Sequence, residues 1–228
     1  MGIRLTKLQS EPFTAERTWS LEELPVLSAA IRLPRPLPTA KDRASRRIRY
    51  YYLSQSRAFL RYCQNWLLPQ AQEAARASLA SSVPVFHLLA ELDYQVTWNQ
   101  SGLWSLYTQS REIFGSGAPF LRRWGDTWDL TSGFPLPLSA CCPKKFPWKK
   151  QLLAEASCSI RDREDSGVSR YYEDWGYALR QHFNPRNFYL TEKGLSFFYP
   201  MYTIAPASEQ IPVFTVPYCP EGFHPPDV

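Results

Sequence analysis

Two aromatic, extended runs near the C-terminus indicate that this 228-residue chain contains a β-sheet. The runs Phe188–Leu190 and Leu195–Tyr199 are joined by the residues Thr-Glu-Lys-Gly. Aromatic residues favour strands, and a short connection that ends in Gly194 favours a hairpin, because glycine can take a positive φ. A third short strand is predicted at Val213–Val216, after a proline-bounded loop. We therefore expect an ordered aromatic surface that packs or binds.

The rest of the chain alternates between helical and extended patterns. A strand is predicted at Val26–Leu33, and the long helical pattern Thr39–Ala80 follows a proline-rich connector. Val83–Leu130 is rich in strand-forming residues and predicts a long hairpin. Two shorter helices are predicted at Trp148–Ser159 and Tyr171–Phe183.

The long helical pattern carries an aromatic stripe, which we expect to face the core. Its members approximate helical spacing: Ile48, Tyr52, Phe59, Tyr62 and Trp66. Pro69 should kink or restart this helix, because proline has no N–H to donate. The charged segment 160–170 contains a glycine and is predicted to be a loop.

Size and composition indicate one globular domain. The chain is 44% hydrophobic and 15% aromatic, and it is long enough to bury a core without cross-links. We predict an α+β fold, with helices packed on one face of an antiparallel sheet. The domain spans residues 24–218 and is followed by a proline-rich surface tail (219–228). The preceding N-terminal arm (residues 1–23) is alternatively an edge strand.

The cysteines indicate free thiols rather than a disulfide framework or a metal site. They are odd in number and scattered: Cys63, Cys141, Cys142, Cys158 and Cys219. No Cys-x-x-Cys motif occurs, and the three histidines lie far from them in sequence. We expect neither a metal nor a cofactor.

The chain is basic, with a net charge of +5 and a pI near 9. Its cations cluster in two segments, one at Arg43, Arg46, Arg47, Arg49 and Arg57, the other at Lys144, Lys145, Lys149 and Lys150. Such clusters are usually solvated helix faces, so nucleic acid is not the expected partner. It stays an alternative, because the lysines alternate with Phe146, Pro147 and Trp148. The start of the chain lacks an apolar signal-peptide region, and no apolar run is long enough for a membrane span. These features favour a cytoplasmic location.

The C-terminal motifs carry a family resemblance. They read Phe188-Tyr-Leu-Thr-x-x-Gly-Leu, then Phe198-Tyr-Pro-x-Tyr-x-Ile-Ala-Pro, then Ile211-Pro-x-Phe-Thr-Val-Pro-Tyr. This pattern resembles the RsiV-type domain, the extracellular part of anti-sigma-V factors. The same domain precedes the catalytic domain of PdaC-type peptidoglycan deacetylases. The stretch that begins Asp126-Thr-Trp-Asp-Leu-Thr-Ser-Gly also resembles a strand and turn of that family.

The resemblance implies a bacterial sensing domain whose partner is a lysozyme-like protein. It also implies an extracellular location, in contrast to the features above. The loop Gly115-Ser-Gly-Ala-Pro119 departs from the family by lacking a histidine. The metal-binding motifs of the deacetylase domain do not occur, so that activity is not expected here.

Nothing in the sequence forms a recognisable catalytic motif, and we predict a non-enzymatic binding protein. The candidate partner-binding residues lie between two strands: Tyr199, Pro200, Met201, Tyr202 and Pro206. Alternatively, Tyr202 and Ile204 pack in the core. The alternative function is a cell-wall glycan-acting enzyme or accessory domain, in which Asp126 and Asp129 would act. These two carboxylates are three residues apart on a predicted strand and so point to opposite faces.

Overall fold

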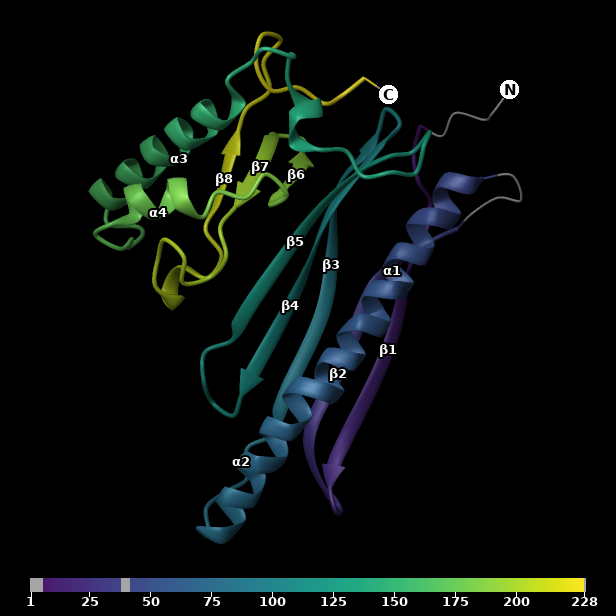
Figure 1. The fold of residues 1–228 in the computed structure, drawn as a ribbon, viewed down its shortest axis with the longest axis vertical. Coiled ribbons are helices and arrows are strands. Elements are labelled where there is room, and N and C mark those ends of the chain that lie inside the picture. The colour runs from purple at the N-terminus through teal and green to yellow at the C-terminus, as the bar shows by residue number, and fades with distance from the viewer. Residues whose placement is uncertain (1–5, 38–41, 228) are drawn as a thin grey trace. The chain divides into compact units, whose positions relative to one another are not determined.

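The computed structural model describes residues 6–37 and 42–227 (Figure 1). The strands are β1 (Ser10–Leu21), β2 (Leu24–Pro36), β3 (Leu88–Gln100), β4 (Leu103–Phe114), β5 (Phe120–Asp129), β6 (Phe188–Thr191), β7 (Gly194–Phe198) and β8 (Val213–Val216). The α-helices are α1 (Arg43–Tyr62), α2 (Leu68–Ala80), α3 (Trp148–Asp165) and α4 (Trp175–Gln181). Within the described ranges, no helix is both long enough and apolar enough to cross a membrane.

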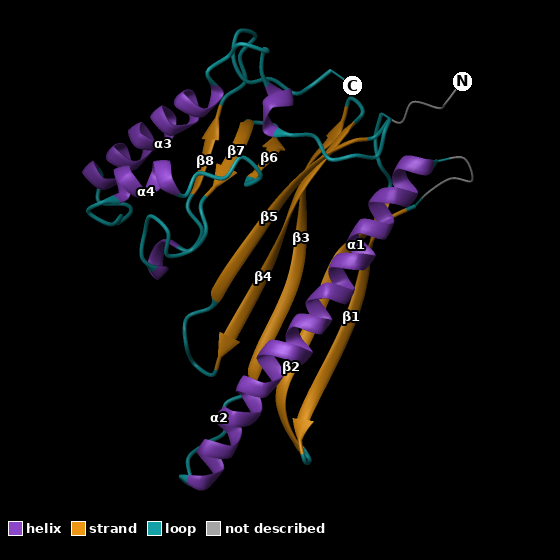
Figure 2. Ribbon diagram, viewed as in Figure 1, coloured by secondary structure: helices purple, strands orange, loops and turns teal. Residues whose placement is uncertain are grey.

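The strands form two sheets, as Figure 2 shows, and the predicted α+β class is confirmed. The larger sheet has the order β1-β2-β3-β4-β5, and the smaller one the order β6-β7-β8. The larger sheet departs from the expected antiparallel arrangement at one place, because β2 and β3 pair in parallel, with Leu27 opposite Leu88. The helical segment between these strands supplies the long connection that a parallel pair requires.

Contacts divide the chain into two compact units. Unit 1 comprises Met1–Leu8, Gln95–Tyr107 and Leu121–Val228. Unit 2 comprises Gln9–Tyr94 and Thr108–Phe120. Strands β3 and β4 contribute residues to both.

In unit 2, helix α1 packs on strand β2. Asp42 begins the helix by accepting a hydrogen bond from the Ser45 backbone N–H at 2.9 Å. Ile48, Tyr52 and Phe59 are buried, as the stripe predicts. Their burial against the apolar side of β2 holds α1 across the sheet.

The stripe does not continue to Trp66, whose side chain is 66% exposed. The expected core position is wrong because the helix passes through a π-helical turn at Cys63–Leu67. There the Leu68 N–H bonds to the Cys63 carbonyl, five residues back, and the following Pro69 has no N–H to continue the α-helical pattern. The extra residue in this turn rotates Trp66 out of the buried face.

In unit 1, the predicted C-terminal hairpin is present as β6 and β7, with Phe188 opposite Phe197. Strand β8 pairs with β7, also as expected. Helices α3 and α4 join this sheet in one aromatic core that includes Phe197, Phe214 and Phe223. The ring centroids of Phe197 and Phe214 lie 5.5 Å apart.

A buried hydroxyl connects three strands of unit 1. Ser105 Oγ on β4 lies 2.7 Å from the Thr127 hydroxyl on β5, and it accepts a hydrogen bond from the Leu190 N–H on β6 at 2.9 Å. Gly125 on β5 lies so close to Phe188 that a Cβ would be 1.9 Å from the Phe188 carbonyl oxygen. Because Gly125 has no side chain, the backbones of β5 and β6 can approach closely enough for the hydrogen bonds of Ser105 to form.

Residues 10–21 of the N-terminal arm form β1, the edge strand of the larger sheet, as the alternative interpretation has it. Two other segments differ from their predicted roles. Helix α3 extends to Asp165, into the predicted loop, because Leu152, Ala156 and Ile160 bury one continuous helical face. The predicted surface tail folds back, since Phe223 is buried and the His224 N–H bonds to the Cys141 carbonyl at 2.9 Å.

We predict that Gly125→Ala lowers the free energy of unfolding by about 1–3 kcal/mol, because the new methyl group overlaps the backbone at Phe188. The matched control is Gly176→Ala in α4, where a Cβ meets nothing within 4 Å. That change should be neutral, or stabilising by up to about 1 kcal/mol. Urea unfolding followed by circular dichroism measures both, and equal stability of the two variants would contradict the close approach.

Candidate ligand-binding groove

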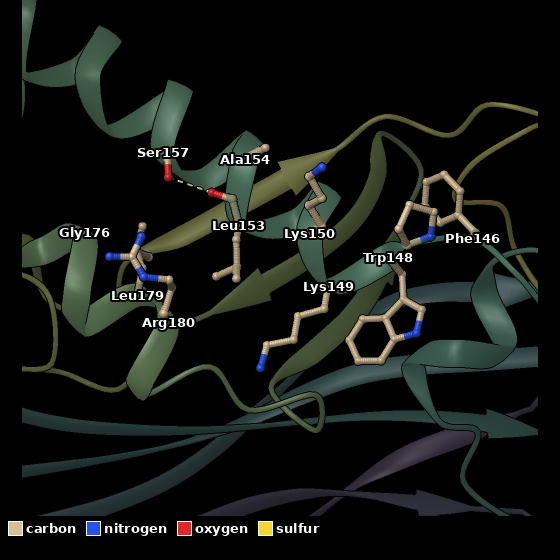
Figure 3. A pocket seen from close by; sticks show the side chains of 11 residues that line it. Phe146, Trp148, Lys149, Lys150, Leu153, Ala154, Ser157, Gly176, Leu179 and Arg180 are labelled. Carbon is tan, nitrogen blue, oxygen red and sulfur yellow. Dashed lines mark hydrogen bonds between the residues drawn. The ribbon is translucent and has the colours of Figure 1, made fainter.

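A groove of about 730 Å³ lies between the first half of α3 and helix α4, entirely within unit 1 (Figure 3). Its eleven lining residues are Phe146, Pro147, Trp148, Lys149, Lys150, Leu153, Ala154, Ser157, Gly176, Leu179 and Arg180. The groove falls in the size range of roughly 300–1,000 Å³ that is typical of small-ligand sites.

The charged part of this groove is entirely cationic. Lys149 and Lys150 come from α3 and Arg180 from α4, and no lining residue is acidic. Among the described residues, these three cations form no ion pair. The Lys149 ammonium lies 5.6 Å from the centroid of the Phe183 ring, a distance at which the aromatic face attracts the cation.

The apolar part of the groove consists of aromatic and leucine side chains. Trp148 is half-buried, and its ring centroid is 6.1 Å from that of Phe183. Phe146 is held edge-on against the buried Phe223 at 5.2 Å. Leu179 is buried below the groove. A ligand that enters therefore meets fixed rings and several cations.

Two interactions hold the helices that form the groove. The Arg163 guanidinium donates to the Val213 carbonyl on β8 at 3.1 Å and stacks over Phe214 at 5.2 Å, which fixes α3 on the small sheet. The Tyr199 hydroxyl donates to the Leu179 carbonyl at 2.8 Å, which fixes α4. Burial raises the pKa of Tyr199, so its hydroxyl remains a donor at neutral pH.

The predicted partner-binding residues separate into buried and accessible ones. Tyr199 and Met201 are buried, so they cannot contribute to a surface, and for these two residues the expected exposure is wrong. Their side chains serve the core, where the Met201 sulfur lies 3.4 Å from the Leu121 backbone nitrogen. Pro200 is exposed and Pro206 half-buried, and Tyr202 is 50% exposed.

Tyr202 has an unusual backbone conformation, with a φ of +63°. A non-glycine residue in this region costs roughly 1–2 kcal/mol. Ile204 lies in the core as the alternative interpretation proposes, whereas Tyr202 does not. The loop thus presents one large aromatic side chain on a strained backbone.

In the alternative enzymatic hypothesis, Asp126 and Asp129 would act together. No contact among the described residues brings their carboxylates face to face. The Asp129 carboxylate accepts hydrogen bonds from the N–H groups of Thr131 and Ser132, at 2.7 and 3.2 Å. It therefore stabilises the turn after β5. Among the described residues, no three side chains of His, Cys, Asp or Glu gather in a metal-binding arrangement.

All five cysteines are free, in agreement with the predicted thiols. Cys63 and Cys141 are fully buried, and burial raises the pKa of each thiol to about 12. The negative charge of Glu112 adds to the effect at Cys63. Neither thiol is an effective nucleophile at neutral pH, because the reactive form is the thiolate.

The groove is not among the sites predicted from the sequence. Its signal is the run from Lys144 to Lys150, in which lysines alternate with Phe146, Pro147 and Trp148. Arg180 and Gly176 complete the groove only when α4 folds beside α3.

Comparisons with known proteins match a family to a segment that contains nine of the eleven lining residues. Residues 148–219 match the family described as "Protein of unknown function (DUF3298)". This segment begins at Trp148 and contains α3, α4, the small sheet and the Tyr202 loop. The comparison with curated proteins finds no match.

Two crystal structures of DUF3298 family proteins share the fold. A member from Bacteroides fragilis NCTC 9343 has a TM-score of 0.67 and 15% identity, over 93% of this chain and 91% of that one. A protein from Pseudomonas aeruginosa PAO1 has a TM-score of 0.58 and 18% identity, over 96% and 95%. The expected domain of unknown function is thus supported, while the narrower RsiV-type assignment stays a prediction.

We predict that two thiols of the native protein react rapidly with a chromogenic disulfide reagent at pH 8, and that five react after denaturation. The fast pair should be Cys158 and Cys219, which are exposed, and the slow thiols should be Cys63, Cys141 and Cys142. Mass spectrometry of the labelled peptides identifies the reacted residues. Rapid labelling of Cys63 or Cys141 in the folded protein would contradict their burial.

Proposed function

We propose that this chain is a non-enzymatic binding domain whose ligand occupies the groove between α3 and α4. The observation that carries the proposal is the set of three groove cations, Lys149, Lys150 and Arg180, without a carboxylate among the lining residues. In a partly enclosed site such cations favour an anion, because an opposite charge restores the interactions lost on leaving water.

The aromatic and aliphatic side chains of the groove restrict the class of ligand further. Trp148 and Phe146 offer aromatic surface, and Leu153 and Leu179 offer aliphatic surface, beside the cations. A suitable ligand therefore combines a flat or apolar ring face with a negative group. Carboxylate-bearing fragments of cell-wall glycan have both features, and this is the ligand class that we propose.

The test is calorimetric titration of the full chain with soluble peptidoglycan fragments. We expect Lys149→Glu and Arg180→Glu each to weaken binding about tenfold or more, which corresponds to about 1.4 kcal/mol. Gly176→Trp should abolish binding by filling the groove, whereas Gly176→Ala should bind like the wild type because open space surrounds that position.

Two results would contradict this proposal. Unchanged binding by the folded Gly176→Trp variant would place the ligand elsewhere. Turnover of the glycan by the wild-type protein, detected by chromatography of the titrated sample, would favour the alternative enzymatic function.

A second candidate function is recognition of a lysozyme-like protein, which the RsiV-type resemblance implies. The observation that favours it is Tyr202, exposed on a strained backbone between Pro200 and Pro206. Strained conformations concentrate at functional sites, and tyrosine supplies a large contact area with little loss of side-chain entropy. The loop is also held in place, since the Thr203 N–H bonds to the Pro200 carbonyl at 3.2 Å.

We expect Tyr202→Gly to lose lysozyme binding while retaining the fold, because glycine tolerates the positive φ and can raise the free energy of unfolding by up to about 1 kcal/mol. The matched control is Tyr177→Ala, which removes an exposed tyrosine from α4. Surface plasmon resonance with immobilised lysozyme measures both. Absence of wild-type binding, or equal binding by the Tyr202→Gly variant, would exclude this function for the loop.

A further inference from the structure

Helix α1 in unit 2 carries six arginines and no acidic residue. Exposed arginines and one aromatic residue are separated by three, four or seven residues, with Arg46 and Arg47 adjacent: Arg43, Arg46, Arg47, Tyr50, Arg57 and Arg61. Residues at this spacing lie on one side of a helix, so they form a continuous row, the arginine stripe. From Arg43 to Arg61 the stripe spans about 27 Å at the helical rise of about 1.5 Å per residue.

Three arginines of this stripe take no part in the described salt bridges. Those of unit 2 join Arg32 to Asp93, Arg35 to Glu11, Arg76 to Glu73 and Arg111 to Glu91. None of these arginines is on α1, and Arg43, Arg57 and Arg61 form no salt bridge with any described residue. Because α1 itself carries no acidic residue, these three arginines keep both ends of the stripe positive.

The stripe faces away from the packed side of α1. Ile48, Tyr52 and Phe59 are buried on the opposite side, where α1 lies against β2 in Figure 2. Because this apolar side is already occupied, α1 cannot insert it into a bilayer as an interfacial helix does. A partner must bind the polar side alone.

The chemistry of the stripe favours phosphate groups and flat rings. Every cation of α1 is arginine, and none is lysine. A diffuse negative surface attracts both residue types, but the planar arginine fork also binds phosphate in a bidentate manner and stacks on bases. Tyr50 lies in the middle of the stripe and is 70% exposed, which leaves its ring face available for stacking.

We propose that the arginine stripe binds single-stranded nucleic acid, with the arginines on successive phosphates and Tyr50 stacked on a base. A single strand fits better than a duplex, because only an unstacked base can lie on a tyrosine ring. The sequence pattern alone favours a solvated helix face and leaves nucleic acid as an alternative. The additional observations are the exposure of Tyr50 and the absence of Arg43, Arg57 and Arg61 from the described salt bridges. The site is independent of the groove, which lies in unit 1.

The test is fluorescence anisotropy of a labelled twenty-nucleotide oligo-dT or oligo-U with the full chain at 50–300 mM salt. We expect affinity to fall with salt at a log–log slope of about −3, as for roughly four phosphate contacts on a single strand. Arg57→Glu/Arg61→Glu should weaken binding at least thirtyfold, and Tyr50→Ala about tenfold. Arg57→Lys/Arg61→Lys should weaken it about threefold or more although the charge is kept.

The matched control is Lys144→Glu/Lys145→Glu, which changes the net charge equally at two exposed lysines that neither lie on α1 nor line the groove, and it should bind within twofold of the wild type. Equal loss in this control would overturn the proposal in favour of non-specific attraction to a basic protein. Binding to phosphatidylserine vesicles without oligonucleotide binding would also overturn it. Thermal unfolding monitors the fold, and if the double glutamate variant does not fold, the lysine and Tyr50→Ala variants decide the result.

Discussion

The hydroxyl of Ser105 occupies the point where β4, β5 and β6 meet within unit 1. It lies beside the Thr127 hydroxyl, receives the Leu190 N–H and donates to the Asp126 carbonyl at 3.1 Å. Leaving one of these buried polar groups without a hydrogen bond would cost about 1–3 kcal/mol. The three strands are therefore held in the positions at which all of these hydrogen bonds form. Gly125 provides the space that this arrangement requires, since any side chain there would overlap the backbone of β6. The small sheet, and the helices that cover it, depend on this approach.

The groove follows from how α3 and α4 rest on that sheet. Arg163 fixes α3 to β8, and the Tyr199 hydroxyl fixes α4 through the Leu179 carbonyl. With both helices held by their buried sides, their outward residues form the groove walls, and the cations of both helices border the same space. The absence of acidic groups among the lining residues is the basis of the anionic ligand that we propose. Tyr199, which the sequence suggests as a contact residue, instead supports the groove from within the core.

The arginine stripe presents a different kind of basic surface. In the groove, two lysines and an arginine border a largely open space that suits a small anionic ligand. On α1, arginines and Tyr50 form an extended row that suits a linear polyanion. The net charge of +5 does not distinguish the two partner classes, because it is a sum over the whole chain. The arrangement of the cations distinguishes them.

Elements with a local periodicity could be predicted from the order of the residues alone. The hairpin of β6 and β7, strand β8, and the buried positions Ile48, Tyr52 and Phe59 follow from patterns of neighbouring residues, because strand and helix periods are properties of the backbone. Features that depend on distant partners could be found only in the folded chain. The parallel pairing of β2 with β3 requires the completed helical connection, and the burial of Phe223 requires the aromatic core that it joins. The exposure of Trp66 depends on a π-helical turn, which simple helical spacing does not include. The groove exists because residues from two helices meet, and no single segment of the sequence contains that contact.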